Sequence, residues 1–374
     1  MIKILFFVDT TLASGGAEKV LRTLVNNMDQ SKFDITVQTA WPENAEKYLA
    51  PDIRYKSLYK KKNRITKFLY RIETMLGLTY RLRMKDDYDI EVAYLENGPT
   101  KVLASSTNKN AIKIAWVHCD LCQMVDDPAS LSKKAKKWYS KYNKVVCVAE
   151  SVKESYVSLF GNIPEAVVLH NTVDSNDIIM KGTEPLPWNV RKRKCTFATV
   201  GRFYHPKGYD RLLRVHKRLI DEGFDYDLWI LGDGPGRTEL ERFIQENDLE
   251  GSVCLHGFQK NPYSFMTNAD IVVCSSRYEG FSTVVAEALI LGKPVVTTNC
   301  SGMYELLGDS EYGMIIENSE QGLYEGMKKM LRDPQLLSYY QAQAQHRGQS
   351  FHMRSLVGRT EEFFADELGE IRSQ

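Results

Sequence analysis

Glu279 and Glu287, eight positions apart, are the residues whose chemistry organises this sequence. An apolar β-branched run over 269–274 predicts a buried strand before them, and residues 284–291 predict a helix that Gly292 ends. The glycine turn between strand and helix offers backbone N–H groups and a positive dipole end to an anion. The pattern predicts a ligand with a central phosphate between hydroxyl-rich groups, such as a sugar nucleotide. The same two acids also fit an ordinary surface turn and helix start.

Positive charge suited to such a phosphate stands in a second glycine loop. Arg202 and Lys207 lie between Gly201 and Gly208, directly after a predicted strand over 196–200. A guanidinium binds phosphate oxygens in pairs, and an ammonium acts as a point charge. Two further units of strand and loop follow, and they carry Gly232, Gly234 and Phe258.

The first half of the chain opens with the same alternation. A strand over 2–8 leads into a loop with Gly15 and Gly16 and then a helix over 19–28, which is typical of a nucleotide-binding fold. The loop has no G-x-G-x-x-G, so a dinucleotide site is unsupported, and a plain turn fits the two glycines equally well. His118 ends a predicted strand over 112–117, where imidazole can meet a sugar hydroxyl or a phosphate oxygen. A structural role for a lone histidine stays open.

Composition excludes several classes of protein. Apolar residues make up 43% and charged residues 26%, and no apolar run is long enough to span a membrane. Residues 2–8 are too short for a secretory signal, and seven scattered cysteines suit a reducing compartment. Cys119-x-x-Cys122 has no second pair at zinc spacing, which disfavours a metal or redox role.

The net charge of +1 divides unevenly, with +5 up to Met180 and −4 beyond it. The segment 54–85 is the most basic, and apolar residues fall on one helical face within it. This pattern is typical of a helix that lies on an anionic membrane, and a solvated basic face over a core is the alternative. Four lysines between Lys133 and Lys137, followed by Trp138, point the same way. No nucleic-acid module accompanies the charge, so we expect no nucleic-acid partner.

Two D-x-D sequences, Asp87–Asp89 and Asp225–Asp227, match the pattern of metal-dependent sugar transfer. Each precedes its predicted strand, whereas ligands gather at the carboxyl ends. We therefore interpret both as solvated turn acids and expect no metal and no other cofactor. Arg202 and Lys207 would supply the positive charge instead.

The stretch from Ser275 to Val296 resembles the retaining glycosyltransferases of the large family-four type, also named group 1. Glu279 and Glu287 match that family's E-x7-E motif, and Gly201 to Gly208 resembles its Gly-Arg…Lys-Gly loop. Residues 170–174 resemble its Asn-Gly-Val-Asp signature, with Thr172 in place of the glycine. The similarity covers most of the chain and is strongest from Gly201 to Val296.

The resemblance implies the two-domain GT-B fold: two doubly wound, parallel α/β domains that face a central cleft. We expect an acceptor-binding domain over 1–181, joined by the C-terminal helix 353–374, and a nucleotide-sugar domain over 190–352. It also implies catalytic roles for His118, Arg202, Lys207 and Glu279. The expected donor-binding residues are Gly15, Gly16, Gly201, Gly232, Gly234, Phe258, Gly280, Phe281, Ser282, Thr283 and Glu287.

The activity so implied is transfer of a hexose or N-acetylhexosamine, with retained configuration, to a glycan acceptor that we expect to be lipid-linked. A UDP-sugar donor is favoured and GDP-mannose remains open. The setting would be capsule, exopolysaccharide or lipopolysaccharide synthesis, in the cytoplasm and at the inner face of the plasma membrane. A sugar-nucleotide epimerase of the same fold and a non-catalytic partner of a sister transferase are the alternatives.

Overall fold

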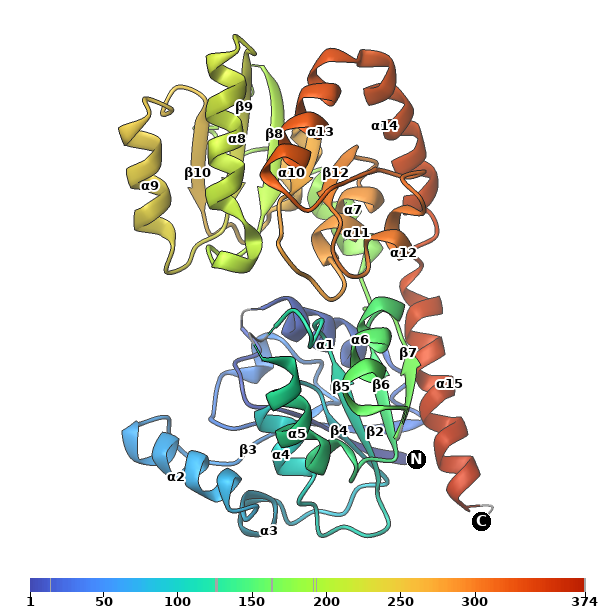
Figure 1. The fold of residues 1–374 in the computed structure, drawn as a ribbon. Helices are drawn as coiled ribbons and strands as arrows, with labels where there is room; N and C mark the ends of the chain where they lie inside the picture. The colour runs from blue at the N-terminus through green and yellow to red at the C-terminus, as the bar shows by residue number, and fades with distance from the viewer. Residues whose placement is uncertain (14, 125–126, 163, 191, 193, 373–374) are drawn as a thin grey trace. The chain divides into compact units, whose positions relative to one another are not determined.

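A computed structural model describes residues 1–13, 15–124, 127–162, 164–190, 192 and 194–372. The chain divides into two compact units (Figure 1). Unit 1 combines residues 1–172 with the end of the chain from Met353, and unit 2 spans Val173–His352. Each unit is built on one parallel sheet with helices packed beside it.

Unit 1 holds a seven-stranded sheet of order β3-β2-β1-β4-β5-β6-β7. Its strands are β1 Ile2–Val8, β2 Phe33–Thr39, β3 Arg54–Ser57, β4 Ile90–Ala93, β5 Ile112–Val117, β6 Lys144–Cys147 and β7 Glu165–Val168. Its helices are α1 Gly16–Asn27, η1 Ala45–Lys47, α2 Arg64–Met75, α3 Thr79–Arg83, α4 Gly98–Leu103, α5 Pro128–Tyr139, α6 Glu150–Phe160 and α15 Met353–Arg372. Strand order reverses between β1 and β4, so ligands are expected beyond the carboxyl ends of these two strands.

Unit 2 holds a six-stranded sheet of order β10-β9-β8-β11-β12-β13. Its strands are β8 Cys195–Val200, β9 Tyr226–Leu231, β10 Val253–Gly257, β11 Ile271–Cys274, β12 Val295–Thr298 and β13 Met314–Ile316. Its helices are α7 Ser175–Gly182, η2 His205–Lys207, α8 Tyr209–Asp221, α9 Arg237–Glu246, α10 Tyr263–Asn268, α11 Thr283–Ile290, α12 Met303–Leu307, α13 Glu320–Arg332 and α14 Pro334–Gly348. The reversal here lies between β8 and β11.

Buried apolar strands explain both sheets. The β1 side chains from Ile4 to Val8 are inaccessible to solvent, as are Ile271, Val272 and Val273 of β11. Strands covered on both faces need such continuous apolar runs, and an all-parallel sheet is normally covered on both faces. The expectation of two doubly wound α/β domains is therefore confirmed.

Helix α15 belongs to unit 1 because its aromatic residues complete that unit's core. Phe364 is fully buried, and its ring meets Phe6 of β1 at 5.9 Å and Trp116 of β5 at 6.5 Å, edge to face in both cases. The helix runs from Met353 to Arg372, so Ser373 and Gln374 of the expected helix lie outside the described residues.

Helix α7 corrects the expected boundary at residue 181. The structure assigns Ser175–Gly182 to unit 2, where α7 packs against α10 and α11. A Cβ at Gly182 would stand 2.7 Å from Thr267 Oγ1 and 2.8 Å from a Leu291 methyl, so this glycine permits the close packing. The chain therefore enters unit 2 before this helix rather than after it.

The Phe364 packing gives a test of how α15 is held. Phe364→Ala should destabilise unit 1 by about 3–5 kcal/mol, the usual cost of removing a buried phenyl ring. Phe363→Ala, next to it on the helix and only partly buried, is the matched control and should cost clearly less. Urea unfolding followed by tryptophan fluorescence measures both. Equal effects of the two variants would contradict the assignment of α15 to the unit 1 core.

Candidate functional site

The predicted anion-binding turn lies at the point of unit 2 where strand order reverses. Strand β11 ends at Cys274, and α11 begins at Thr283 after an N-cap at Ser282, whose Oγ accepts from Val285 N at 3.4 Å. Gly292 follows the helix with φ +64°. The predicted strand, turn and helix are confirmed, and the first turn of α11 leaves backbone N–H groups without helical partners.

Lys207 and Glu279 meet beside this turn. Lys207 Nζ lies 2.6 Å from Glu279 Oε1, which also accepts a 2.6 Å bond from Ser276 Oγ. Burial by itself would lower the pKa of Lys207, but the facing Glu279 carboxylate outweighs it and raises that pKa above its ordinary value. The structure thus brings together two residues that sequence reasoning assigned separately, one to the diphosphate and one to the sugar.

Arg202 and Glu287 stand in contrasting surroundings. The Arg202 side chain is exposed after β8, and no ion pair to it occurs among the described residues. Glu287 is only 3% exposed, and Tyr263 donates its hydroxyl to Glu287 Oε1 at 3.4 Å. Arg202 is therefore open to an anionic ligand, whereas Glu287 already has a protein partner in the wall of the site.

Several of the predicted glycines are required because the loops of unit 2 pack against one another. Gly232, after β9, has φ +140°, and a Cβ there would lie 1.9 Å from Gly201 O. A Cβ at Gly208 would lie 2.1 Å from Ser275 O, and one at Gly234 would lie 2.8 Å from Phe203 N. These contacts give the glycines a packing reason of their own, apart from any ligand.

The remaining predicted donor-binding residues also lie at carboxyl ends of strands. Phe258 follows β10 and is 72% exposed, whereas Gly280, Phe281 and Ser282 are buried in the turn before α11. Thr283 is the first residue of that helix and is partly exposed. A ligand would therefore meet the exposed ring and the helix end more readily than the buried part of the turn.

Arg211 fixes the shape of the turn, and no local sequence pattern marks this residue. It lies on α8, is 6% exposed, and donates to Ser275 O at 2.7 and 3.0 Å and to Ser276 O at 2.7 Å. Asp210, the residue before it on the helix, accepts two hydrogen bonds from the Arg277 guanidinium, at 2.7 and 2.8 Å. Contacts of two arginines thus hold the chain just before Glu279.

His118 lies at the carboxyl end of β5 in unit 1, as predicted. Its ring packs 4.6 Å from Tyr94 and stacks at 6.2 Å on Trp116, and neither ring nitrogen is exposed or has a hydrogen-bond partner among the described residues. Burial lowers the pKa of His118 to about 3. The imidazole is therefore neutral at physiological pH, with one donor nitrogen and one acceptor nitrogen, both covered by the surrounding protein.

Glu96 and Asp9 complete this end of the unit 1 sheet, and sequence reasoning missed both. Glu96 accepts from the backbone N–H groups of His118 and, at 3.1 Å, of Cys119, and burial raises its pKa. Asp9 directly follows β1. Each acid comes just after an apolar strand, the signal that identified His118. Gly15, with φ +120°, caps α1, and Gly16 begins that helix.

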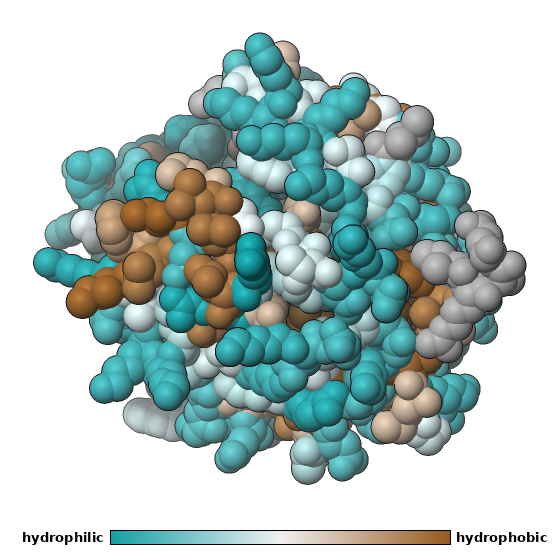
Figure 2. All heavy atoms as spheres, turned by 90° about the horizontal axis from the view of Figure 1, so that it is seen from below, coloured by the Kyte–Doolittle hydropathy of each residue, from teal (hydrophilic) through white to brown (hydrophobic). Residues whose placement is uncertain are grey.

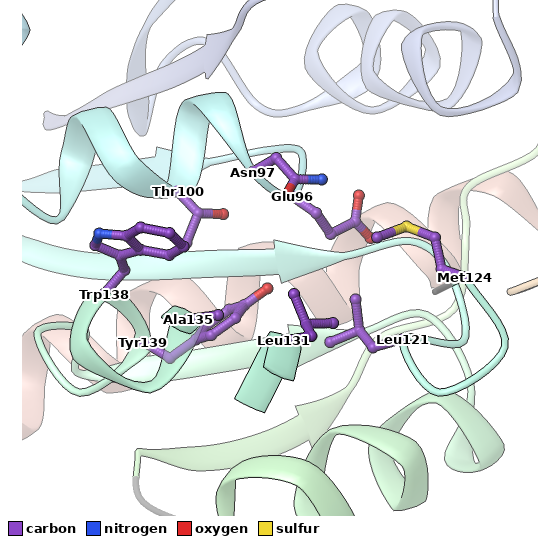
Figure 3. A pocket seen from close by; sticks show the side chains of 9 residues that line it. All are labelled: Glu96, Asn97, Thr100, Leu121, Met124, Leu131, Ala135, Trp138 and Tyr139. Atoms are coloured by element: carbon purple, nitrogen blue, oxygen red, sulfur yellow. The ribbon is translucent and has the colours of Figure 1, made fainter. Parts of the chain in front are cut away.

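A small hollow, partly open to solvent, lies beside Glu96. Figure 3 shows Glu96, Asn97 and Thr100 along one side and Leu121, Leu131 and Tyr139 along the other. The walls are mostly apolar, with the Glu96 carboxylate at one end.

The D-x-D sequences lie away from these carboxyl ends. Asp89 Oδ2 accepts from Lys3 N at 2.8 Å just before β4, and Asp225 pairs with Lys194 at 2.5 Å. Asp227 was expected to be a solvated turn acid, and this prediction is wrong: Asp227 is the second residue of β9 and is 8% exposed. Cys119 and Cys122 are both free thiols.

The depressed pKa of His118 predicts a pH dependence of stability. The ordinary histidine pKa of about 6.5 applies to the unfolded chain. Below that pH, His118 therefore binds a proton in the unfolded state but not in the folded state. The free energy of unfolding therefore has its full value above the unfolded-state pKa and decreases as the pH falls below it. The expected decrease is ~1.4 kcal/mol at pH 5.5 relative to pH 7.5. Urea unfolding of His118→Gln should show a flatter curve over this range. The exposed His352→Gln is the control, and an unchanged slope in His118→Gln would contradict a neutral buried imidazole.

Comparison with known proteins agrees with this geometry. Residues 183–347 match the family model described as glycosyl transferases group 1. The chain is 29% identical, over 353 residues, to the N-acetylgalactosamine-N,N'-diacetylbacillosaminyl-diphospho-undecaprenol 4-alpha-N-acetylgalactosaminyltransferase of Campylobacter jejuni, covering 91% of this chain and 93% of that protein. It is 25% identical to the amylovoran biosynthesis glycosyltransferase of Erwinia amylovora, over 86% and 88% of the two chains.

A solved structure shares the fold of the whole chain. The crystal structure of Anabaena HepE in complex with UDP and glucose aligns with a TM-score of 0.75 and 18% identity, over 98% of this chain and 100% of that one. Both parallel sheets and the family match lead to the same assignment. The chain has the two-domain GT-B fold, and its residues 183–347 match the group 1 glycosyltransferases.

Proposed function

We propose that this glycosyltransferase moves a hexose or N-acetylhexosamine from a nucleoside diphosphate sugar to a glycan acceptor, with retained configuration and without a metal ion. One observation carries the proposal: at the reversal of strand order in unit 2, an exposed arginine, a lysine–glutamate pair and a helix N-terminus stand together. These are the groups that a diphosphate and a sugar hydroxyl require.

Unit 2 would bind the donor, and unit 1 would recognise the acceptor. Arg202 and Lys207 would stabilise the charge that develops on the departing diphosphate, and this stabilisation is stronger in the transition state than in the ground state. Glu279, already held by Lys207, would accept bonds from hydroxyls of the transferred sugar. Glu287 would accept from the ribose, in place of Tyr263.

Retention would follow from attack on the same face as the leaving group, with a phosphate oxygen accepting the proton of the acceptor. Covalent retaining catalysis needs a carboxylate free to attack the sugar carbon. Both Lys207 and Ser276 bind one oxygen of Glu279, which favours a positioning role for this acid over a nucleophilic one.

The names of similar proteins support a donor and an acceptor class. Anabaena HepE, which shares the fold, was solved with UDP and glucose, and we favour a UDP-sugar on that basis. The Campylobacter relative acts on a diphospho-undecaprenol-linked sugar, and the Erwinia relative belongs to amylovoran biosynthesis. We therefore propose a lipid-linked acceptor in the assembly of a cell-surface polysaccharide.

The proposed place of action is the cytoplasm, at the inner face of the plasma membrane. Within the described part of the chain, no helix is both long enough and apolar enough to cross a bilayer. The +5 charge of the first half would instead draw unit 1 to an anionic lipid surface.

Incubation with a panel of sugar nucleotides, first alone and then with a lipid-linked saccharide, tests this function. Transfer of sugar only when the acceptor is present, with the α- or β-configuration of the donor retained in the product, is the expected result. Conversion of a donor in the absence of an acceptor would indicate an epimerase instead. Inertness with every donor would favour a non-catalytic partner.

Removal of the site charges should separate chemistry from folding. Arg202→Gln and Lys207→Gln should each lower kcat by about 10²- to 10³-fold, the usual cost of losing one group that stabilises transition-state charge. Lys217→Gln, which breaks an exposed pair with Asp221 on α8, is the matched control and should keep normal turnover. Near-normal kcat in Arg202→Gln would refute its proposed role.

Lys207→Gln also leaves the Glu279 carboxylate without its cation, so part of its effect could come from lost stability. The double variant Lys207→Gln/Glu279→Gln removes both charges. It should melt closer to the parent chain than Lys207→Gln does, yet stay inactive. Recovery of turnover in the double variant would show that the pair is structural only.

A further inference from the structure

Helix α2 is amphipathic, but its apolar face points to solvent and its polar face points to the protein. Its apolar residues form one stripe at helical spacing, and this stripe faces solvent: Ile65 is 69% exposed, Phe68 62% and Met75 76%. Leu69 and Leu76 extend the stripe, and exposed Leu78 and Leu82 continue it at and beyond the start of α3. A helix of a soluble protein normally turns such a face to the core. We name these seven residues the apolar stripe.

Polar contacts fix α2 in this orientation. Tyr70 and Glu73 form its buried face, and Glu73 binds the guanidinium of Arg83 and the hydroxyl of Tyr59 at 2.7 Å. Asn63 and Thr66 close a capping box at its N-terminus. Rotation of the helix to bury its apolar stripe would break these bonds and leave the Arg83 guanidinium without its carboxylate partner. The exposure is thus built into the fold.

Positive charge surrounds the apolar stripe and is not neutralised by the protein. Within the described residues, no ion pair is made by the following residues: Lys60, Lys61, Arg64, Lys67, Arg71 and Arg81. Figure 2, a view of the surface from below, shows a hydrophobic cluster bordered by hydrophilic side chains on the same side as α2 in Figure 1. Long basic side chains at the edge of an apolar surface can reach lipid headgroups while their stems stay in the apolar layer.

We infer that α2 and the start of α3 lie in the headgroup region of an anionic bilayer, with the apolar stripe inserted among the acyl chains. The inference rests on the proposed function and extends it, because it names the surface of the protein that would contact the membrane. A bilayer satisfies both halves of the surface: the apolar residues leave water and the cations meet anionic headgroups. A second copy of the chain fits less well, because a symmetric contact would bring the same unpaired cations together.

The inserted helix is joined directly to the carboxyl end of β1. The Tyr70 hydroxyl donates to Asp9 Oδ2 at 3.1 Å, and a Cβ at Gly98 would lie 1.8 Å from the same oxygen and 2.9 Å from the Tyr70 hydroxyl. Asp9, Tyr70 and the start of α4 are therefore packed without spare room. Membrane docking would hold the edge of the unit 1 sheet, where His118 and Glu96 also stand, next to the lipid surface.

Co-sedimentation of the full-length chain with vesicles tests the inference without any substrate. The probes are phosphatidylcholine vesicles and vesicles in which about one-third of the lipid is phosphatidylglycerol. The chain should bind the anionic vesicles far more tightly, and added salt should weaken binding.

Two sets of variants separate insertion from charge. Ile65→Ser/Phe68→Ser/Met75→Ser should reduce partitioning by about 1,000-fold, since burial of each side chain contributes roughly tenfold. Lys67→Gln/Arg71→Gln/Arg81→Gln should reduce it by about 100-fold, at roughly fivefold for each charge. Trp188→Ser and Lys217→Gln, which change an exposed aromatic and an exposed cation of unit 2, are the matched controls and should bind as the parent does.

Parent-like vesicle binding by the serine triple variant would overturn the inference. So would self-association of the parent, seen by sedimentation velocity, that the serine variant abolishes while neither binds vesicles. All three serine substitutions are at exposed positions, and unfolding midpoints will confirm that the variants fold. Failure of vesicle binding would not count against the proposed transferase activity, because donor and acceptor assays in detergent measure that activity separately.

Discussion

The ion pair between Lys207 and Glu279 is the interaction on which the proposed donor site depends. The lysine comes from the loop after β8 and the acid from the loop after β11, adjacent strands at the reversal of the unit 2 sheet. A Cβ at Gly208 would collide with Ser275 O. Only a glycine at this position therefore lets the two loops approach each other. Without a donor the two charges satisfy each other, and a diphosphate sugar would bind between partners that are already in place, so little reorganisation is required.

The two units differ in how they treat charge. Unit 2 keeps cations at its strand ends and an exposed Arg202, as an anionic donor requires. Unit 1 keeps His118 neutral: the ring packs against Tyr94 and Trp116, and Glu96 binds backbone N–H groups rather than the imidazole. In the proposed reaction the acceptor hydroxyl is uncharged before it attacks the sugar carbon, so a neutral imidazole suits it better than a cation would. Several cations of unit 1 that make no ion pair within the described residues lie elsewhere, around the exposed face of α2.

Much of the architecture could be predicted because strands in parallel sheets are continuous apolar runs and helices carry periodic ones. Strands β1 and β5 occur with the predicted ends. The turn at Glu279 was also predictable, since glycine, an N-cap serine and a proline stop are local signals. Tertiary partners were not: the bonds from Arg211 to Ser275 and Ser276 join segments more than sixty residues apart, and no local pattern marks them. The apolar side of α2 was visible in the sequence, but its outward orientation depends on distant polar contacts.

The central claim is that unit 2 binds a nucleoside diphosphate through side-chain cations and helix-end amides rather than through a metal ion. Calorimetric titration of the chain with UDP, once with EDTA and once with Mg²⁺, measures this directly. The account predicts the same affinity in both titrations, and a loss of roughly tenfold or more in Arg202→Gln because a charge-assisted bond is removed. Binding that appears only with the divalent ion, or that is unaffected by loss of Arg202, would contradict it.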